Sequence, residues 1–152
     1  MNSPSLKKAK EIKLPSHVLD LTLGPDKQLY AACLDGGIYE VSTTFKLLGD
    51  NFKEIARHDN YASGINWSAS QKTLISASYD GDLKWIDPKE KKESKNLKAH
   101  NFWSWQSRVS PDGKLIATST GQYLCGGYKY EPAPETEPVS YTHLTLPTSY
   151  AV

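Results

Sequence analysis

Three residue types that can perform hydrolytic chemistry occur within a short span, at His58, Ser76 and Asp80. In serine hydrolases, a histidine held by a carboxylate accepts the proton of the serine nucleophile. That reaction also requires an exposed serine and an oxyanion site, and the residues near Ser76 offer neither. We therefore expect no catalytic residue among the three.

Metal and cofactor chemistry lacks its usual motifs in this sequence. His17, His58 and His100 each fall near the start of a repeated segment, without a cluster of cysteines or carboxylates at ligand spacing. There is also no CxxC pair, HExxH, GxSxG or phosphate-binding glycine loop. We predict a chain without metal, cofactor or enzyme activity, and leave open the activity of a longer parent chain.

The elements that position these residues form an internal repeat. Its starts, at Leu14, His58 and His100, are 44 and 42 residues apart. After each start come two short segments that favour β-strands, and third strands are predicted at 38–42 and 83–87. An Asp-Gly pair, whose glycine takes a positive φ without strain, precedes both third strands. The second strands are expected at Leu29–Cys33, Thr73–Ala77 and Lys114–Thr118.

A period of about 40–45 residues holding about four short strands is the spacing of a β-propeller blade. On this period, and on His58, Ser76, Asp80-Gly81 and the turn Ser110-Pro-Asp-Gly113, the sequence resembles the WD40-repeat family over most of residues 14–120. The resemblance implies an all-β fold, a partial WD40-type β-propeller of about three antiparallel four-stranded blades, truncated at its C-terminal end. It also implies that His58, Ser76 and Asp80 form a structural hydrogen-bonded set within one blade, because a buried carboxylate needs donors.

The repeat divides the chain into segments. Blade 3 lacks the Asp of the set, and Gly121 stands in its place, so we expect an insertion loop there in place of a hairpin. The expected segments are an N-terminal tail and outer strand at 1–13, blade 1 at 14–57, blade 2 at 58–99, and an incomplete blade 3 at 100–138 with its insertion at 121–138.

Other departures from the family concern Leu14, Val41 and Ile86, which stand where the family has His or Trp. Only blade 2 is therefore expected to hold a partial polar set. Trp85 comes one residue before the family's Trp position, so the two-residue period of a strand turns it to the opposite side. We expect Trp85 to pack between blades.

Residues 139–152 are expected to be non-native. The run Val-Ser-Tyr-Thr-His-Leu-Thr-Leu-Pro-Thr, at 139–148, resembles a one-frame translation of the transposase-end adapter used in short-read DNA sequencing. Chance is a poor explanation for ten consecutive residues in one frame. We therefore predict an adapter-derived tail, exclude it from fold reasoning, and expect the natural chain to continue beyond Pro138.

Trp103, Tyr123, Tyr128 and Tyr130 are candidates for a partner surface. The tyrosines alternate with small residues in the expected insertion, and loops on rigid scaffolds often carry function. The same pattern also suits a loop that packs on its own blade. Trp103 lies in an aromatic cluster with Trp105, whose rings either anchor a partner or fill the gap between blades.

Net charge and hydropathy limit the classes of partner that we expect. The formal net charge is +1, and Lys89–Lys95 alternates in sign, so nucleic acid and anionic membranes are not expected. No apolar stretch approaches the roughly 20 residues of a membrane span, and no secretory signal begins the chain, which makes the cytoplasm the default location. We expect a non-catalytic protein–protein interaction scaffold, whose partners are other proteins and the C-terminal blades of its own chain. The alternatives are a propeller-based enzyme or sensor, or a module that positions a catalytic domain.

Overall fold

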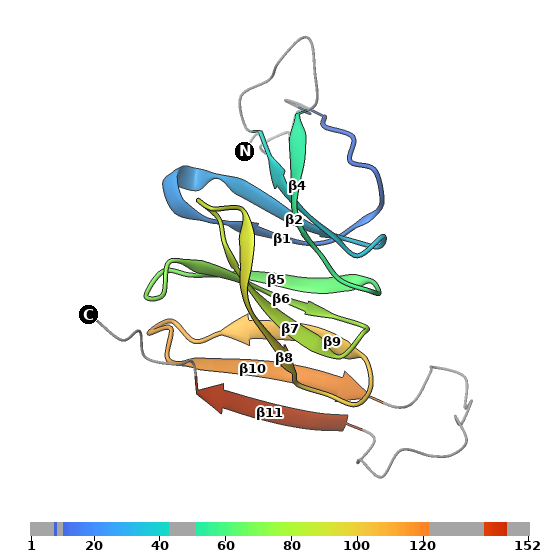
Figure 1. Ribbon diagram of the computed structural model, residues 1–152, viewed down its shortest axis with the longest axis vertical. Helices are drawn as coiled ribbons and strands as arrows, with labels where there is room; N and C mark the ends of the chain where they lie inside the picture. The colour runs from blue at the N-terminus through green and yellow to red at the C-terminus, as the bar shows by residue number, and fades with distance from the viewer. Residues whose placement is uncertain (1–7, 9–10, 43–50, 122–138, 146–152) are drawn as a thin grey trace, which may run out of the picture.

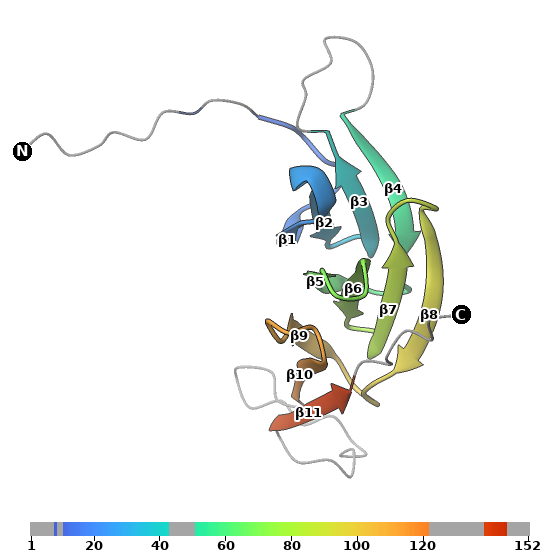
Figure 2. The same ribbon diagram turned by 90° about the vertical axis from the view of Figure 1, so that its left-hand side faces the viewer.

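The fold is that of a computed structural model, which describes residues 8, 11–42, 51–121 and 139–145, the last segment as backbone. Three antiparallel β-sheets are stacked along the long axis of the molecule (Figure 1). The first strand of each sheet lies on one side of the stack, and the fourth strands β4 and β8 lie on the other (Figure 2). The predicted all-β fold of antiparallel sheets is confirmed.

Each sheet corresponds to one repeat of the sequence, and we call the sheets blades 1, 2 and 3. Blade 1 contains β1 (Val18–Leu23), the 3-10 turn η1 (Pro25–Lys27), β2 (Leu29–Cys33), β3 (Gly37–Val41) and β4 (Phe52–Arg57). Blade 2 contains β5 (Ala62–Ser68), β6 (Thr73–Ser78), β7 (Asp82–Asp87) and β8 (Lys92–Lys98). Blade 3 contains β9 (Ser104–Val109), β10 (Leu115–Gly121) and β11 (Val139–Thr145).

Two Asp-Gly turns, one in blade 1 and one in blade 2, each form a hydrogen bond to the segment that leads into the next blade. Gly36 and Gly81 have φ values of +82° and +86°, a backbone region that glycine occupies without strain. The carbonyl oxygen of Gly36 accepts the N–H of His58, and that of Gly81 accepts the N–H of His100. Each turn therefore holds the chain where it enters the next blade.

The cores between blades follow from strand alternation in β7. Ile86 is fully buried with residues of blades 1 and 2, including Ile38 and Ile65. Trp85 points to the other side, where it packs with Ile75 of blade 2 and Ile116 of blade 3. The structure thus places Trp85 between blades 2 and 3, as the two-residue period predicts.

Blade 1 has an open face on the side away from blade 2. Leu21 and Leu23 of β1 are 52% and 58% exposed. Their counterparts in blade 2, Ile65 and Trp67, occupy equivalent positions in the strand ladder, and Ile65 is 2% exposed against blade 1. Leu21 and Leu23 therefore lie on the face of blade 1 that corresponds to the face of blade 2 buried against blade 1.

Of the N-terminal tail and outer strand predicted at 1–13, the structure describes residues 8 and 11–13. Residues 11–14 form no strand; Ile12 and Leu14 instead pack on the open side of blade 1, against a cluster that includes Cys33. The cluster that these two side chains cover consists of residues of β2 and β3. Cys33 is fully buried, and burial, with the charge of nearby Asp35, raises the pKa of its thiol to about 11.

The third blade has a strand that the sequence analysis excluded. β11, from the expected adapter-derived tail, pairs with β10 from Leu115↔Thr145 to Gly121↔Val139. Its β-branched and aromatic residues favour strands, and β10 would otherwise present an unpaired edge. β10 also includes Gly121, the first residue of the expected insertion; residues 122–138 lie outside the described part of the chain.

Within the described residues, no helix has the length and apolar character needed to cross a membrane.

Candidate functional site

The structure brings together the three residues with potential hydrolytic chemistry. Nε2 of His58 lies 2.8 Å from Oγ of Ser76, and Nδ1 lies 3.1 Å from Oδ2 of Asp80. An ionised carboxylate only accepts hydrogen bonds, so Nδ1–H of His58 donates to Asp80. In the neutral ring, Nε2 then accepts a hydrogen bond from the hydroxyl group of Ser76. The order of atoms is that of a serine-hydrolase triad.

Burial distinguishes this set from a catalytic triad. Ser76 is fully buried and His58 is 3% exposed, so a substrate has no approach to the hydroxyl oxygen. Asp80 also accepts backbone N–H groups from Asp59 and Asp82, at 3.1 and 2.9 Å. The carboxylate thus connects the segment before β5 with the turn between β6 and β7. Its role is to hold these segments together.

The electrostatics of Asp80 agree with this arrangement. Burial by itself would raise the pKa of the carboxyl group. The hydrogen bonds from His58 and from the N–H groups of Asp82 and Asp59, together with the charge interaction with His58, outweigh burial and lower the pKa to about 2. Asp80 is therefore ionised over the physiological range.

Blade 3 holds a second polar pair that the sequence analysis did not predict. Nε2 of His100 lies 2.7 Å from Oγ1 of Thr118, and both residues are buried. The His–Thr spacing of 18 residues equals that of His58 and Ser76, so threonine takes the serine position. The expectation that only blade 2 holds such a set was wrong. By the same spacing the equivalent of Asp80 is Gln122 and not the predicted Gly121, and Gln122 lies outside the described residues.

Blade 1 stabilises the corresponding turn by different chemistry. The hydroxyl of Tyr39 donates to Oδ2 of Asp35 at 2.7 Å, and the N–H of Gly37 donates to Oδ1 at 3.1 Å. Arg57 donates to the carbonyl oxygen of Asp35 at 2.6 Å. Although burial opposes the shift, these hydrogen bonds and the Arg57 charge lower the pKa of Asp35. Leu14 leaves blade 1 without the histidine, and tyrosine and arginine supply the donors.

The inner strands of the three blades are also joined by polar contacts. Oδ2 of Asp20 in β1 accepts the N–H of Ile65 in β5 at 3.0 Å and lies 3.6 Å from the Arg108 guanidinium of β9. Nδ2 of Asn66 donates to the carbonyl oxygen of Ser107 at 3.0 Å. These contacts fix the relative positions of the strands, and Arg108 is 59% exposed, so its ion pair adds little stability.

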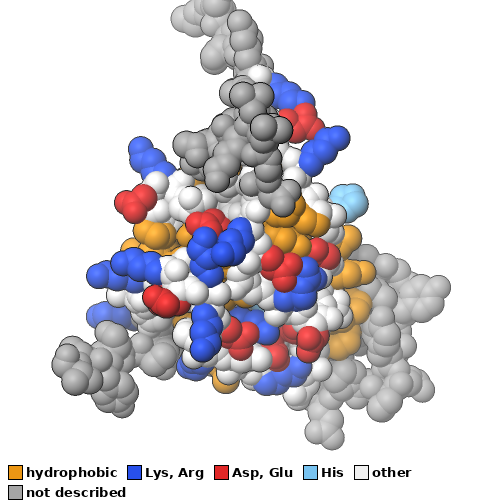
Figure 3. All heavy atoms as spheres, turned by 45° about the horizontal axis from the view of Figure 1, so that its top comes forward, with side chains coloured by type: hydrophobic (Ala, Val, Ile, Leu, Met, Phe, Trp, Pro, Cys, Tyr) orange, Lys and Arg blue, Asp and Glu red, His pale blue; other side chains and the backbone are white. Residues whose placement is uncertain are grey.

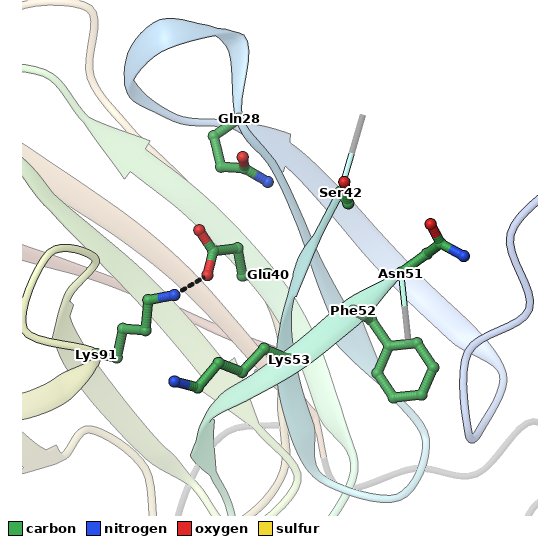
Figure 4. A pocket seen from close by; sticks show the side chains of 7 residues that line it. All are labelled: Gln28, Glu40, Ser42, Asn51, Phe52, Lys53 and Lys91. Atoms are coloured by element: carbon green, nitrogen blue, oxygen red, sulfur yellow. Dashed lines mark hydrogen bonds and ion pairs between the residues drawn. The ribbon is translucent and has the colours of Figure 1, made fainter. Parts of the chain in front are cut away.

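On the outer side, a hollow of about 270 Å³ lies between blades 1 and 2. The Lys91 ammonium, from the turn before β8, forms an ion pair with Glu40 of β3, and the two side chains point toward each other in Figure 4. Gln28 donates to the carbonyl oxygen of Val41 at 2.6 Å beside it. Glu40 and Lys91 are thus engaged with each other across the two blades. Over the face drawn in Figure 3, acidic and basic side chains are interspersed.

An aromatic cluster forms where three connections meet at one end of blades 2 and 3. Tyr79, between β6 and β7, is stacked on Trp103 with a centroid distance of 5.1 Å and an interplanar angle of 13°. Tyr61 and Trp105 lie 5.5 and 5.6 Å from Tyr79. Phe102 stacks on Trp103 at 4.7 Å. We call Tyr61, Tyr79, Phe102, Trp103 and Trp105 the aromatic cluster.

The aromatic cluster is partly open to solvent. Tyr61 is 44% exposed and Trp105 is 37% exposed, whereas Tyr79 and Trp103 are half-buried. The rings therefore both pack between two blades and present a surface. Burial, with a contribution from Tyr61, raises the pKa of Tyr79, so its hydroxyl stays neutral.

Of the predicted partner residues, Trp103 lies within the aromatic cluster. Tyr123, Tyr128 and Tyr130 lie outside the described residues. Sequence reasoning missed Tyr61 and Tyr79, which come from blade 2. The available signal was their position in the sequence, since Tyr61 follows His58 by three residues and Tyr79 directly precedes Asp80. Among the described residues, no three His, Cys, Asp or Glu side chains are grouped as a metal site would require.

Comparison with known proteins identifies the repeat. Residues 49–87 match the family model for the WD domain, G-beta repeat. No curated protein matches the chain. The matched residues span β4 to β7 and contain His58, Ser76 and Asp80. The predicted resemblance is confirmed there: residues 49–87 are a WD40 repeat, set in an all-β chain of stacked antiparallel blades.

Proposed function

We propose that this chain is a non-catalytic scaffold for protein–protein interaction, and that the aromatic cluster is its contact surface. WD40-repeat domains commonly bind proteins and are usually non-catalytic. The observation that carries the proposal is the exposure of Tyr61 and Trp105 on rings that two blades hold in place. Trp and Tyr dominate the binding energy of protein interfaces, because they bury a large area at low cost in conformational entropy.

The rigid support of the rings favours binding. Tyr79 is stacked on Trp103 and also contacts Tyr61, and the turn beside it is held by the hydrogen bonds of Asp80. A surface that is already ordered loses little entropy when a partner binds. The hydrogen-bonded set of His58, Ser76 and Asp80 therefore supports the surface. The set itself is too buried to contact a substrate.

Selection from a displayed random-peptide library tests this function. Peptides enriched on the wild-type chain should bind the Trp105→Ala or Tyr61→Ala variant about 30-fold more weakly, since a hot-spot residue contributes about 2 kcal/mol or more. Leu23→Ala, which removes a 58% exposed apolar side chain from blade 1, is the matched control and should leave affinity unchanged. Failure to enrich any peptide, or equal losses in all three variants, would reject the aromatic cluster as the contact surface.

A further inference from the structure

We propose that the aromatic cluster recognises a cationic side chain, lysine or arginine, presented by the partner protein. This inference rests on the proposed function and specifies the chemistry of the same surface. It depends on the character of the rings and on the charges that lie beside them.

The rings provide the first component. Four of the five are Tyr or Trp, and the faces of these rings attract a cation within about 6 Å of the centroid. The molecule already contains one such contact, between the Lys95 ammonium and the Trp85 ring, at 4.6 Å. Tyr61 and Trp105 are the exposed members, and both contact Tyr79. A cation above this surface would therefore meet several rings.

Aspartates provide the second component. Asp59 lies two residues before Tyr61 and is exposed, and Asp80 directly follows Tyr79. The backbone N–H of Asp59 donates to Oδ2 of Asp80, so the two residues are close together. The Asp80 carboxylate is turned toward His58, and the Lys98 ammonium beside it is paired with Asp82, so Asp59 supplies the exposed negative charge next to the aromatic surface. That charge complements a cation.

The same charges argue against the other ligands of stacked rings. Nucleobases also stack on aromatic side chains, but their binding proteins pair the rings with basic grooves that attract phosphate. The exposed carboxylate of Asp59 would repel that phosphate. Proline-rich peptides bind aromatic grooves without any need for a carboxylate. A cationic side chain uses both the rings and the carboxylate of Asp59.

The test compares short fluorescent peptides that differ at one central position: arginine, lysine, citrulline or norleucine. Citrulline keeps the shape of arginine without its charge. We expect the arginine and lysine peptides to bind about 5- to 30-fold more tightly than the neutral peptides, the range of one partly desolvated cation–π contact. Added salt should weaken only the cationic peptides.

Variants locate the effect. Trp105→Ala should abolish the preference for arginine over citrulline, and Asp59→Asn should reduce it about 3-fold, as expected for one exposed charge. Asp112→Asn is the matched control, because this exposed aspartate lies at the opposite end of β9 and should change nothing. Circular dichroism verifies the fold of each variant.

Two outcomes would overturn the inference. Equal affinity for arginine and citrulline would show recognition of shape alone, and a preference that survives Trp105→Ala would place the cation elsewhere. The peptides selected from the random library separate this failure from that of the proposed function. Cluster-dependent peptides without lysine or arginine would reject the cation but keep the interaction surface.

Discussion

Trp85 and Ile86 are neighbours in β7, and their side chains lie in cores on opposite faces of blade 2. Both are buried, at 4% and 0% exposure. One dipeptide therefore contributes to both junctions, blade 1 with blade 2 and blade 2 with blade 3. Stability in stacked repeats depends on such nearest-neighbour contacts.

Truncation of either residue should loosen one junction selectively. Ile86→Ala should lower the free energy of unfolding by about 2–4 kcal/mol, and Trp85→Ala by about 3–5 kcal/mol, because each leaves a cavity. Amide hydrogen exchange should accelerate mainly in β2 and β3 for Ile86→Ala and mainly in β10 for Trp85→Ala. Exchange that accelerates equally in both regions would contradict separate cores. Leu115→Ala, at an exposed position, serves as the control.

Asp80→Asn should destabilise the chain by about 2–4 kcal/mol, because it removes the charge that accepts hydrogen bonds from His58 and two backbone groups. Chemical denaturation measures the loss. Asp59→Asn, at an exposed neighbour, should cost less than about 0.5 kcal/mol. Since the pKa of Asp80 falls from 3.8 to about 2 on folding, its contribution is present above pH 3.8 and is lost as the pH falls through about 2. The Asp80→Asn variant should therefore lack the part of the acid-induced loss in free energy of unfolding that comes from protonation of Asp80.

His100 predicts a second pH dependence at milder acidity. Burial lowers the pKa of His100, so the unfolded state binds a proton that the folded ring resists. The free energy of unfolding should therefore decrease as the pH falls below about 6.5, the ordinary value for histidine. His100→Gln should show a smaller decrease between about pH 7.5 and pH 5.5. An unchanged decrease would assign the effect to another group.

Gly81→Ala should be strongly destabilising, by more than about 2 kcal/mol, because alanine at φ +86° is strained. A Cβ atom there would lie 2.3 Å from the carbonyl oxygen of His100. Gly64→Ala is the contrasting substitution, since φ there is not positive and the nearest atom would be 3.3 Å away. Thermal unfolding compares the two. Equal melting temperatures would show that the turn does not constrain the entry into blade 3.

The origin of residues 139–152 is a prediction about DNA. Long-read sequencing of the source DNA across codon 138 should diverge from the present reading after Pro138. Uninterrupted coding of Val-Ser-Tyr-Thr-His-Leu in the genome would contradict an adapter origin and make β11 the natural third strand of blade 3.

Much of the fold follows from the sequence because blades are local units. The repeat spacing, the Asp-Gly turns and strand alternation depend on residues within one repeat, so they predicted β2, β6 and the opposite orientations of Trp85 and Ile86. The recurring offsets of His58, Ser76 and Asp80 likewise indicated a set within one blade.

Tertiary structure decided whatever depends on contacts between repeats or on exchanged residue types. Thr118 replaces serine opposite His100, and Tyr39 with Arg57 replaces histidine in blade 1. A hydroxyl or a guanidinium satisfies the polar partner as well as the family residue does, so a residue pattern does not find these replacements. Tyr61, Tyr79 and Trp105 are up to 44 residues apart, and only the stacking of blade 3 on blade 2 brings them together. The candidate interaction surface exists because three connections, far apart in the sequence, meet at the same place.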